Sequence, residues 1–316
     1  MDWSRYNLDR QPFRPVVDTD SYFPSPSHDI ALASVAAGFA RRDPVVLLDG
    51  FPGVGKTLIA RKWLEHLLPD VPRVVLPSAR AEKPAELLQA ILFDLGKSYQ
   101  GLTEQELRLT VTGNLLDAAT ESGYPTVLVL DEAQHLSLSA LEELRLLGNL
   151  ETRRGVAVFV LLVAQPMLRE SLRRAGNEQF AQRIGVRAIV EPLTHQESVA
   201  YLHHQIHAAG GEVEAVFESD AITMVASACN GVPRVLNRAA SLAMELAAES
   251  GASVVDVEAA LEALDRLELQ SVDLDESGES ADPVLLPHPG RATETIPDHP
   301  RGTPGPKDRT DRTRIA

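Results

Sequence analysis

Cysteine is nearly absent from this sequence, because Cys229 is the only one among its 316 residues. A single cysteine cannot form an intramolecular disulfide or build a cysteine-based zinc site, so we expect a reducing, cytoplasmic setting. Long apolar runs are absent as well. The segment 1–14 is polar and lacks the apolar centre of a signal peptide. No stretch reaches the about 18 consecutive apolar residues of a membrane-spanning helix, so we expect no membrane span.

Aromatic residues and positive charge are also scarce. Aromatics make up only 5% of the chain, while Ala, Leu and Val supply most of its 44% hydrophobic content. This balance favours an α/β or α-rich protein over a β-sandwich. The formal net charge is −15. Binding to the DNA backbone requires concentrated Lys and Arg, so the net charge does not support DNA as a partner, which would need a local basic patch.

Strand-like and helical patterns alternate over residues 1–192. Apolar runs predict strands at 45–48, 74–76, 126–130, 157–163 and 186–190. Amphipathic patterns predict helices at 56–68, 84–95, 104–119, 139–151 and 165–174. Such alternation indicates an α/β core with a parallel sheet covered by helices.

The remaining sequence divides into two regions of different composition. Residues 193–269 contain only helical patterns, at 195–207, 219–228, 233–249 and 256–267, and predict a small helical lid domain. Residues 270–316 are rich in Pro, Gly, Asp, Ser, Thr and Arg. They have too few large apolar residues to offset their ordering entropy, so we predict a disordered tail.

A phosphate-binding loop follows the first predicted strand. Residues 50–57 read Gly-Phe-Pro-Gly-Val-Gly-Lys-Thr and match the pattern G-x-x-x-x-G-K-[ST] between a strand and a helix. We predict that Gly50, Phe51, Pro52, Gly53, Val54, Gly55, Lys56 and Thr57 all contribute to ATP binding. The glycines let consecutive N–H groups face an anion, and the following helix adds its N-terminal dipole. Lys56 is expected on the β- and γ-phosphates and the Thr57 hydroxyl on Mg²⁺.

A pair of carboxylates ends the third predicted strand. The run Thr126–Leu130 leads directly into Asp131 and Glu132. The carboxyl ends of the strands are where open α/β sheets bind ligands. We therefore predict that Asp131 holds Mg²⁺ and that Glu132 acts as the general base toward water. The alternative is an acidic turn that caps the next helix.

At this point the sequence resembles an AAA+ ATPase, more narrowly the ExeA-type group (similar to general secretion pathway protein A). The similarity spans roughly residues 3–268. It rests on further blocks in the family's order, which are Trp3–Phe13, Tyr22–His28, Leu141–Thr152, Leu161–Leu168 and Gly231–Arg238, together with the shorter blocks 182–184 and 191–193. The resemblance implies a P-loop NTPase fold, a three-layer α/β/α core with a five-stranded parallel sheet of order 5-1-4-3-2, followed by the lid.

The resemblance also implies roles for four residues. Gln165 would align the attacking water, Arg234 of the lid would reach the γ-phosphate, and Arg183 would complete the site of a neighbouring subunit. Arg187 competes for that last role. Three structural interpretations stay open: Gln165 as a helix N-cap, Arg183 as a surface ion pair and Arg234 as a lid-packing residue.

Two functions fit this resemblance. The first is a homo-oligomeric ATPase that acts as a motor or switch on an unidentified protein partner. The second is a DNA-associated regulator, similar to transposition helper ATPases, that uses ATP for assembly. A switch with little hydrolysis is a third, weaker interpretation.

Overall fold

A five-stranded parallel sheet organises the first part of the chain. The computed structural model describes residues 3–173 and 178–269, so the predicted disordered tail, 270–316, lies outside the described residues. The strands are β1 (Val45–Gly50), β2 (Arg73–Leu76), β3 (Thr126–Leu130), β6 (Val158–Ala164) and β7 (Ile184–Val190). They lie in the order β2-β3-β6-β1-β7, and each neighbouring pair is parallel. This is the order 5-1-4-3-2 read from the other edge, so the predicted fold is confirmed.

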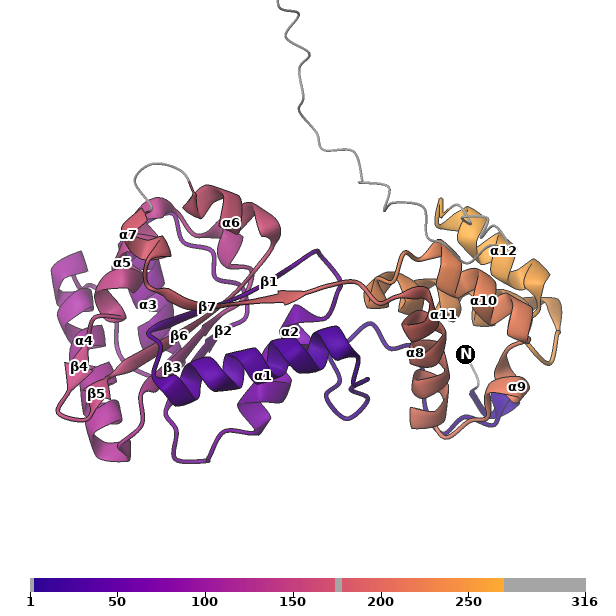
Figure 1. Cartoon of the computed structure of the whole chain (residues 1–316), viewed down its shortest axis with the longest axis horizontal. Coiled ribbons are helices and arrows are strands. Elements are labelled where there is room, and N and C mark those ends of the chain that lie inside the picture. Colours follow the sequence, from indigo (N-terminus) through magenta and orange to yellow (C-terminus); the bar gives the residue numbers. More distant parts are fainter. Residues whose placement is uncertain (1–2, 174–177, 270–316) are drawn as a thin grey trace, which may run out of the picture. The chain divides into compact units, whose positions relative to one another are not determined.

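Helices cover both faces of this sheet, because alternate residues of each strand point to opposite sides. On one face, α1 (Pro26–Arg41) and α2 (Lys56–Glu65) share an apolar cluster with Val46 and Leu48 of β1. On the other face, Val45 and Leu47 pack in a second cluster with α3 (Pro84–Asp94), α4 (Glu104–Ser122), α5 (Leu138–Leu147) and α6 (Pro166–Leu172). Figure 1 shows α1 and α2 together on one side of the strands. The result is the predicted three-layer core.

Several element boundaries differ from the predicted ones. The helix predicted at 139–151 ends at Leu147, with Gly148 as its C-cap, and Glu151 instead opens a small hairpin. That hairpin pairs β4 (Glu151–Thr152) with β5 (Gly155–Val156), and Gly155 has φ +107. The helix predicted at 165–174 spans only 166–172, because Gln165 is extended and Pro166 occupies its first turn. The predicted helices also do not include α1.

The helices after β7 pack around an apolar cluster of their own. They are α8 (His195–Ala208), α9 (Val213–Val216), α10 (Ser219–Ala228), α11 (Pro233–Ser250) and α12 (Val257–Arg266). Short helices elsewhere are η1 (Trp3–Tyr6), η2 (Ala133–His135) and α7 (Glu178–Ala181). No helix among the described residues is both long and apolar enough to cross a membrane.

The N-terminal segment, residues 3–25, joins this helical cluster although it precedes the sheet in sequence. Tyr6, Leu8 and Phe13 are buried in it. The Tyr6 hydroxyl donates to the Met244 carbonyl at 3.1 Å, and Phe13 meets Phe217 edge-on at 6.2 Å. All described residues lie within one compact unit, Met1–Asp273. The chain therefore leaves the helical cluster before it enters the sheet and returns to it afterwards.

Candidate functional site

The glycine-rich loop joins the buried strand β1 to helix α2, and its glycines are required by space and backbone angle. A Cβ on Gly50 would lie 2.6 Å from the Val190 carbonyl oxygen of β7. Gly53 and Gly55 have φ of +83 and +105, a region that side chains rarely adopt. Helix α2 begins at Lys56, so its free N–H groups and dipole face the loop. This arrangement is suited to an anion.

Two residues of the loop turn toward the end of β3. The Thr57 hydroxyl donates to Asp131 Oδ2 at 2.6 Å, and Asp131 is buried. Lys56 is buried too, and its Nζ donates to the Phe51 carbonyl at 2.8 Å. Burial lowers the pKa of Lys56, while the nearby carboxylates of Glu132 and Asp131 oppose that shift. A hydroxyl and a carboxylate oxygen side by side form the kind of oxygen donor pair that Mg²⁺ prefers.

Glu132 follows with its carboxylate held by two amides. Its backbone is left-handed, with φ +55. Its Oε2 accepts hydrogen bonds from the side-chain amides of Gln134 and Gln165, the latter at 3.3 Å. Burial alone would raise the pKa of Glu132, but the two amides and the Lys56 charge outweigh it and place the pKa below its ordinary value. The group is thus ionised and oriented at neutral pH.

The sequence prediction included Gln165 but not Gln134. The Gln165 backbone N–H donates to Gln134 Oε1 at 3.1 Å, so the Gln134 side chain is held between Glu132 and the Gln165 backbone. Gln165 occupies the N-cap position of α6, but its side chain makes no capping hydrogen bond and bonds Glu132 instead. Gln134 stands within the turn after the acidic pair, and no motif in the sequence singles it out.

A cavity of about 740 Å³ opens in front of the loop. Its lining includes Lys56, Thr57, Glu132, Gln165 and Arg234. The Arg234 backbone N–H, at the start of α11, donates to the Gly53 carbonyl at 3.3 Å. Eight of the predicted site residues therefore line this cavity, because Pro52, Gly53 and Gly55 of the loop line it as well.

The two candidates for a subunit-completing arginine lie elsewhere. Arg183 and Arg187 are exposed, and neither lines this cavity. Arg187 of the edge strand β7 lines a second cavity of about 400 Å³, together with Arg169 and Arg173. Both arginines are accessible to a neighbouring molecule, so the geometry does not choose between them.

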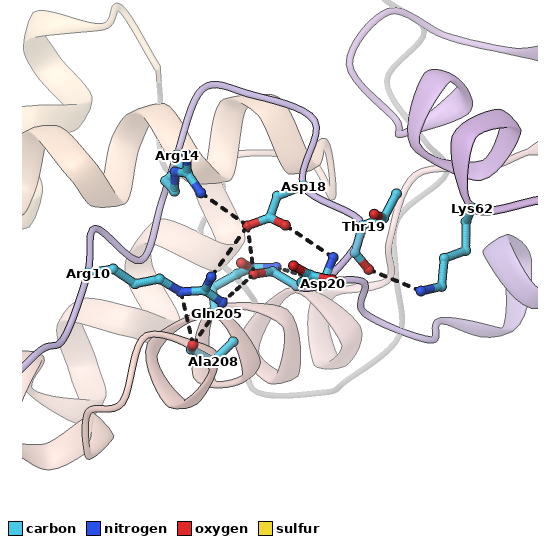
Figure 2. Close-up of polar contacts among 9 residues, drawn as sticks. Arg10, Arg14, Asp18, Thr19, Asp20, Lys62, Gln205 and Ala208 are labelled. Atoms are coloured by element: carbon cyan, nitrogen blue, oxygen red, sulfur yellow. Dashed lines mark hydrogen bonds and ion pairs between the residues drawn. The ribbon is translucent and has the colours of Figure 1, made fainter. Parts of the chain in front are cut away.

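The N-terminal segment also lines the main cavity, a role that the sequence does not indicate. Residues 11–18 form part of its wall. Asp18 is their polar centre, because its Oδ2 accepts from the Arg14 guanidinium at 3.4 Å and the Ser21 hydroxyl at 3.2 Å. Figure 2 shows how the segment is then tied on both sides. Arg10 donates to the Ala208 carbonyl of α8 at 3.0 Å, and Lys62 of α2 donates to the Thr19 carbonyl at 3.2 Å.

A buried ion pair beneath the loop was likewise not predicted. Asp49, the residue before Gly50, is 2% exposed, and its Oδ2 lies 3.3 Å from Nη1 of Arg169 on α6. Burial raises the pKa of Asp49, and the Arg169 charge opposes that shift. The pair links the strand that carries the phosphate loop to the helix that follows Gln165.

Comparison with known proteins agrees with this geometry. Residues 40–172 match the AAA domain family. The chain belongs to the AAA-type P-loop ATPases. It is 33% identical, over 233 residues, to General secretion pathway protein A from Aeromonas hydrophila, covering 73% of this chain and 42% of that protein. The predicted resemblance to the ExeA-type group is thereby confirmed, although the chain spans less than half the length of that relative.

Solved structures share the fold at low sequence identity. The Aeropyrum pernix ORC2 protein, determined as ADPNP–ADP complexes, aligns with a TM-score of 0.63 and 18% identity, over 84% of this chain and 73% of that one. The Aeropyrum pernix ORC1 protein in complex with DNA aligns with the same TM-score of 0.63 and 18% identity, over 82% and 70%. At this identity the likeness establishes the fold alone, a five-stranded parallel sheet covered by helices and followed by a helical cluster.

Proposed function

We propose that this chain binds Mg-ATP in the main cavity and hydrolyses it. One observation carries the proposal: the glycine-rich loop, Thr57 and the oriented Glu132 carboxylate line a single cavity, and Asp131 is hydrogen-bonded to Thr57 there. Gly50 to Thr57 would cradle the phosphates with main-chain N–H groups, and Lys56 would neutralise the β- and γ-phosphates. Thr57 and Asp131 would hold the magnesium ion, which when bound neutralises charge that develops on the phosphates.

The hydrolytic step would use the residues at the end of β3 and β6. Glu132 would take a proton from the attacking water, since its carboxylate is ionised and hydrogen-bonded at neutral pH. Gln165, which bonds the same carboxylate, would orient that water, and Gln134 would hold both groups in place. Arg234 lines the same cavity and would stabilise negative charge on the transferring phosphoryl group.

The chain's action on other molecules follows from the same arrangement. We infer that the predicted core, 1–192, and lid, 193–269, act as two parts, although the segment 3–25 packs with the lid helices. ATP turnover would alter the contact between the two parts and so act on a protein partner. Arg183 or Arg187, both exposed, would complete the site of a neighbouring copy in a homo-oligomer. The similarity to General secretion pathway protein A supports a protein partner. The likeness to ORC1 in complex with DNA keeps a DNA-associated regulator as the second candidate.

Nucleotide binding tests the first proposal directly. Purified protein should bind a fluorescent ADP or ATP analogue more tightly with Mg²⁺ than with EDTA and should release phosphate from ATP. Lys56→Ala should abolish both. Wild-type protein with no magnesium-dependent affinity for adenine nucleotides would exclude the function.

A second measurement separates the two candidate partners. If DNA is the partner, duplex DNA should stimulate turnover, and the stimulation should fall steeply as salt rises, because phosphate contacts release counterions. Turnover that is indifferent to DNA favours the protein-remodelling ATPase.

A further inference from the structure

His28 is buried against the phosphate loop and contributes to the wall of the main cavity, and the roles proposed above do not use it. It lies in the first turn of α1 and is 4% exposed. Its Nε2 lies 2.7 Å from the Val54 carbonyl oxygen, and its Nδ1 contacts the Ser25 hydroxyl. Ser25 and Val54 are both 0% exposed, so water does not compete for these bonds.

The partners of the ring determine which nitrogen carries the proton. A carbonyl oxygen can only accept, so Nε2–H is the donor to Val54. Burial lowers the pKa of His28, and this effect outweighs the Val54 carbonyl and the charges of Asp29 and Glu197, which would raise it. The lowered pKa favours the neutral ring. In the neutral ring Nδ1 is an acceptor, so Ser25 donates its hydroxyl proton to it. The two hydrogen bonds therefore run in one direction, from the Ser25 hydroxyl to His28 and from His28 to the Val54 carbonyl.

The Val54 carbonyl belongs to the same peptide plane as the Gly55 N–H. In a planar trans peptide these two groups point in opposite directions. A hydrogen bond that holds the carbonyl toward His28 therefore turns the Gly55 N–H away from the histidine. Gly55 lines the cavity and belongs to the glycine-rich loop, so this N–H is one of the donors available to a phosphate.

Two more contacts fix the histidine to the loop and to the sheet. A Cβ on Gly55 would lie only 2.7 Å from His28 Nε2, so the ring fits against the loop with no room for a side chain. The Glu191 backbone N–H, just after β7, donates to the Ser27 hydroxyl at 2.8 Å. The start of α1 is thereby attached to the sheet on one side and to the loop on the other.

We propose that His28 is a positioning residue of the phosphate loop. By donating to the Val54 carbonyl, His28 directs the Gly55 N–H toward the nucleotide. This inference rests on the proposed nucleotide-binding function. It requires the Nε2–H donor and not merely a side chain of similar size.

Two conservative variants separate the effect of the Nε2–H donor from the effect of side-chain size. In His28→Gln the amide nitrogen reaches about as far as Nε2 and can still donate to Val54. In His28→Asn it reaches only as far as Nδ1 and cannot. Without the histidine donor, the Gly55 N–H would lose its hydrogen bond to the charged phosphate. Such a bond is worth about 1.5–3 kcal/mol, so His28→Asn should bind ADP and ATP roughly tenfold to a hundredfold more weakly. His28→Gln should stay close to wild type.

The readout uses nucleotides of different phosphate number. AMP lacks the β-phosphate that the loop cradles, so its affinity should change little in either variant. Equal affinities of the Asn and Gln variants for ADP, or an equal loss for AMP and ADP, would overturn the positioning role. A wild-type protein that binds no ADP would overturn it together with the proposed function, which keeps the two failures distinct.

A further variant guards against a folding defect. If His28→Asn does not fold, Ser25→Ala removes the hydroxyl that orients the ring and that also caps α1 by accepting from the His28 backbone N–H, while the His28 side chain is kept. We expect it to weaken ADP binding selectively over AMP in the same way, and a Ser25→Ala protein with wild-type ADP affinity would count against the proposal.

Discussion

Glu132 combines a strained backbone with two amide hydrogen bonds, and its substitution gives the sharpest test of the hydrolytic step. Glu132→Gln keeps the size of the side chain and removes its ability to take a proton. General base catalysis contributes about 10²–10⁴-fold, so kcat should fall by that factor. The Kd for Mg-ATP, measured with the same sample by fluorescence, should stay within a few fold. Turnover equal to wild type would exclude Glu132 as the base.

Residues within contiguous motifs were predictable, and residues brought together by the sheet were not. The loop 50–57 and the pair Asp131 and Glu132 carry their chemistry in adjacent positions, so a short pattern identifies them. The Asp49–Arg169 pair spans from β1 to α6 and depends on how those elements pack. His28 meets Val54 across the whole of α1 and β1. No local pattern encodes such contacts.

Helices α4 and α5 are joined by an ion pair whose carboxylate is far more buried than that of the other ion pair on α5. Arg108 binds both carboxylate oxygens of Glu143 at 2.8 Å, and the Glu143 side chain is 2% exposed. Removing one partner leaves a buried charge unpaired, which costs about 3–5 kcal/mol when both groups are buried. Since Arg108 is 31% exposed, we expect about 2 kcal/mol for Arg108→Met, or a Tm lower by about 4–8 °C in differential scanning calorimetry.

A control for this prediction lies on the same helix. Glu142 and Arg145 form an ion pair at 2.7 Å, but the Glu142 side chain is 51% exposed. Water and salt screen such a pair, so Glu142→Gln should leave Tm unchanged within error. A similar loss of Tm for both variants would mean that burial does not distinguish the two pairs.

At the scale of elements, periodicity located all five strands of the sheet but did not predict which strands lie next to each other. Alternation of strands and helices indicates a parallel sheet, whereas the order came from the family resemblance. The helix predicted at 139–151 extended past the observed end of α5 at Leu147 and included Glu151, the first residue of the hairpin. That hairpin turns at Gly155, whose φ of +107 favours glycine.

Across the whole molecule, the N-terminal segment is the part that connects the helical cluster to the core beside the cavity. Asp18 holds Arg14, Arg10 and Ser21, while Thr19 accepts from Lys62 of α2. We predict that Asp18→Asn loosens this segment. Partly exposed ion pairs contribute about 0.2–1 kcal/mol each, so ADP affinity should fall only about twofold to fivefold.

Limited proteolysis gives the larger signal for this segment, because cleavage follows the population of the opened chain. Trypsin should cut after Arg10 faster in Asp18→Asn than in wild type, because Asp18 pairs with Arg10. ADP with Mg²⁺ should slow that cut in both, since residues 11–18, which follow Arg10, line the cavity. Asp20→Asn, an exposed neighbour, is the matched control and should cut at the wild-type rate. Cleavage after Arg10 that is unaffected by ADP in wild type would show that the segment does not report on the bound nucleotide. Equal rates for Asp18→Asn and Asp20→Asn would show that Asp18 does not hold it.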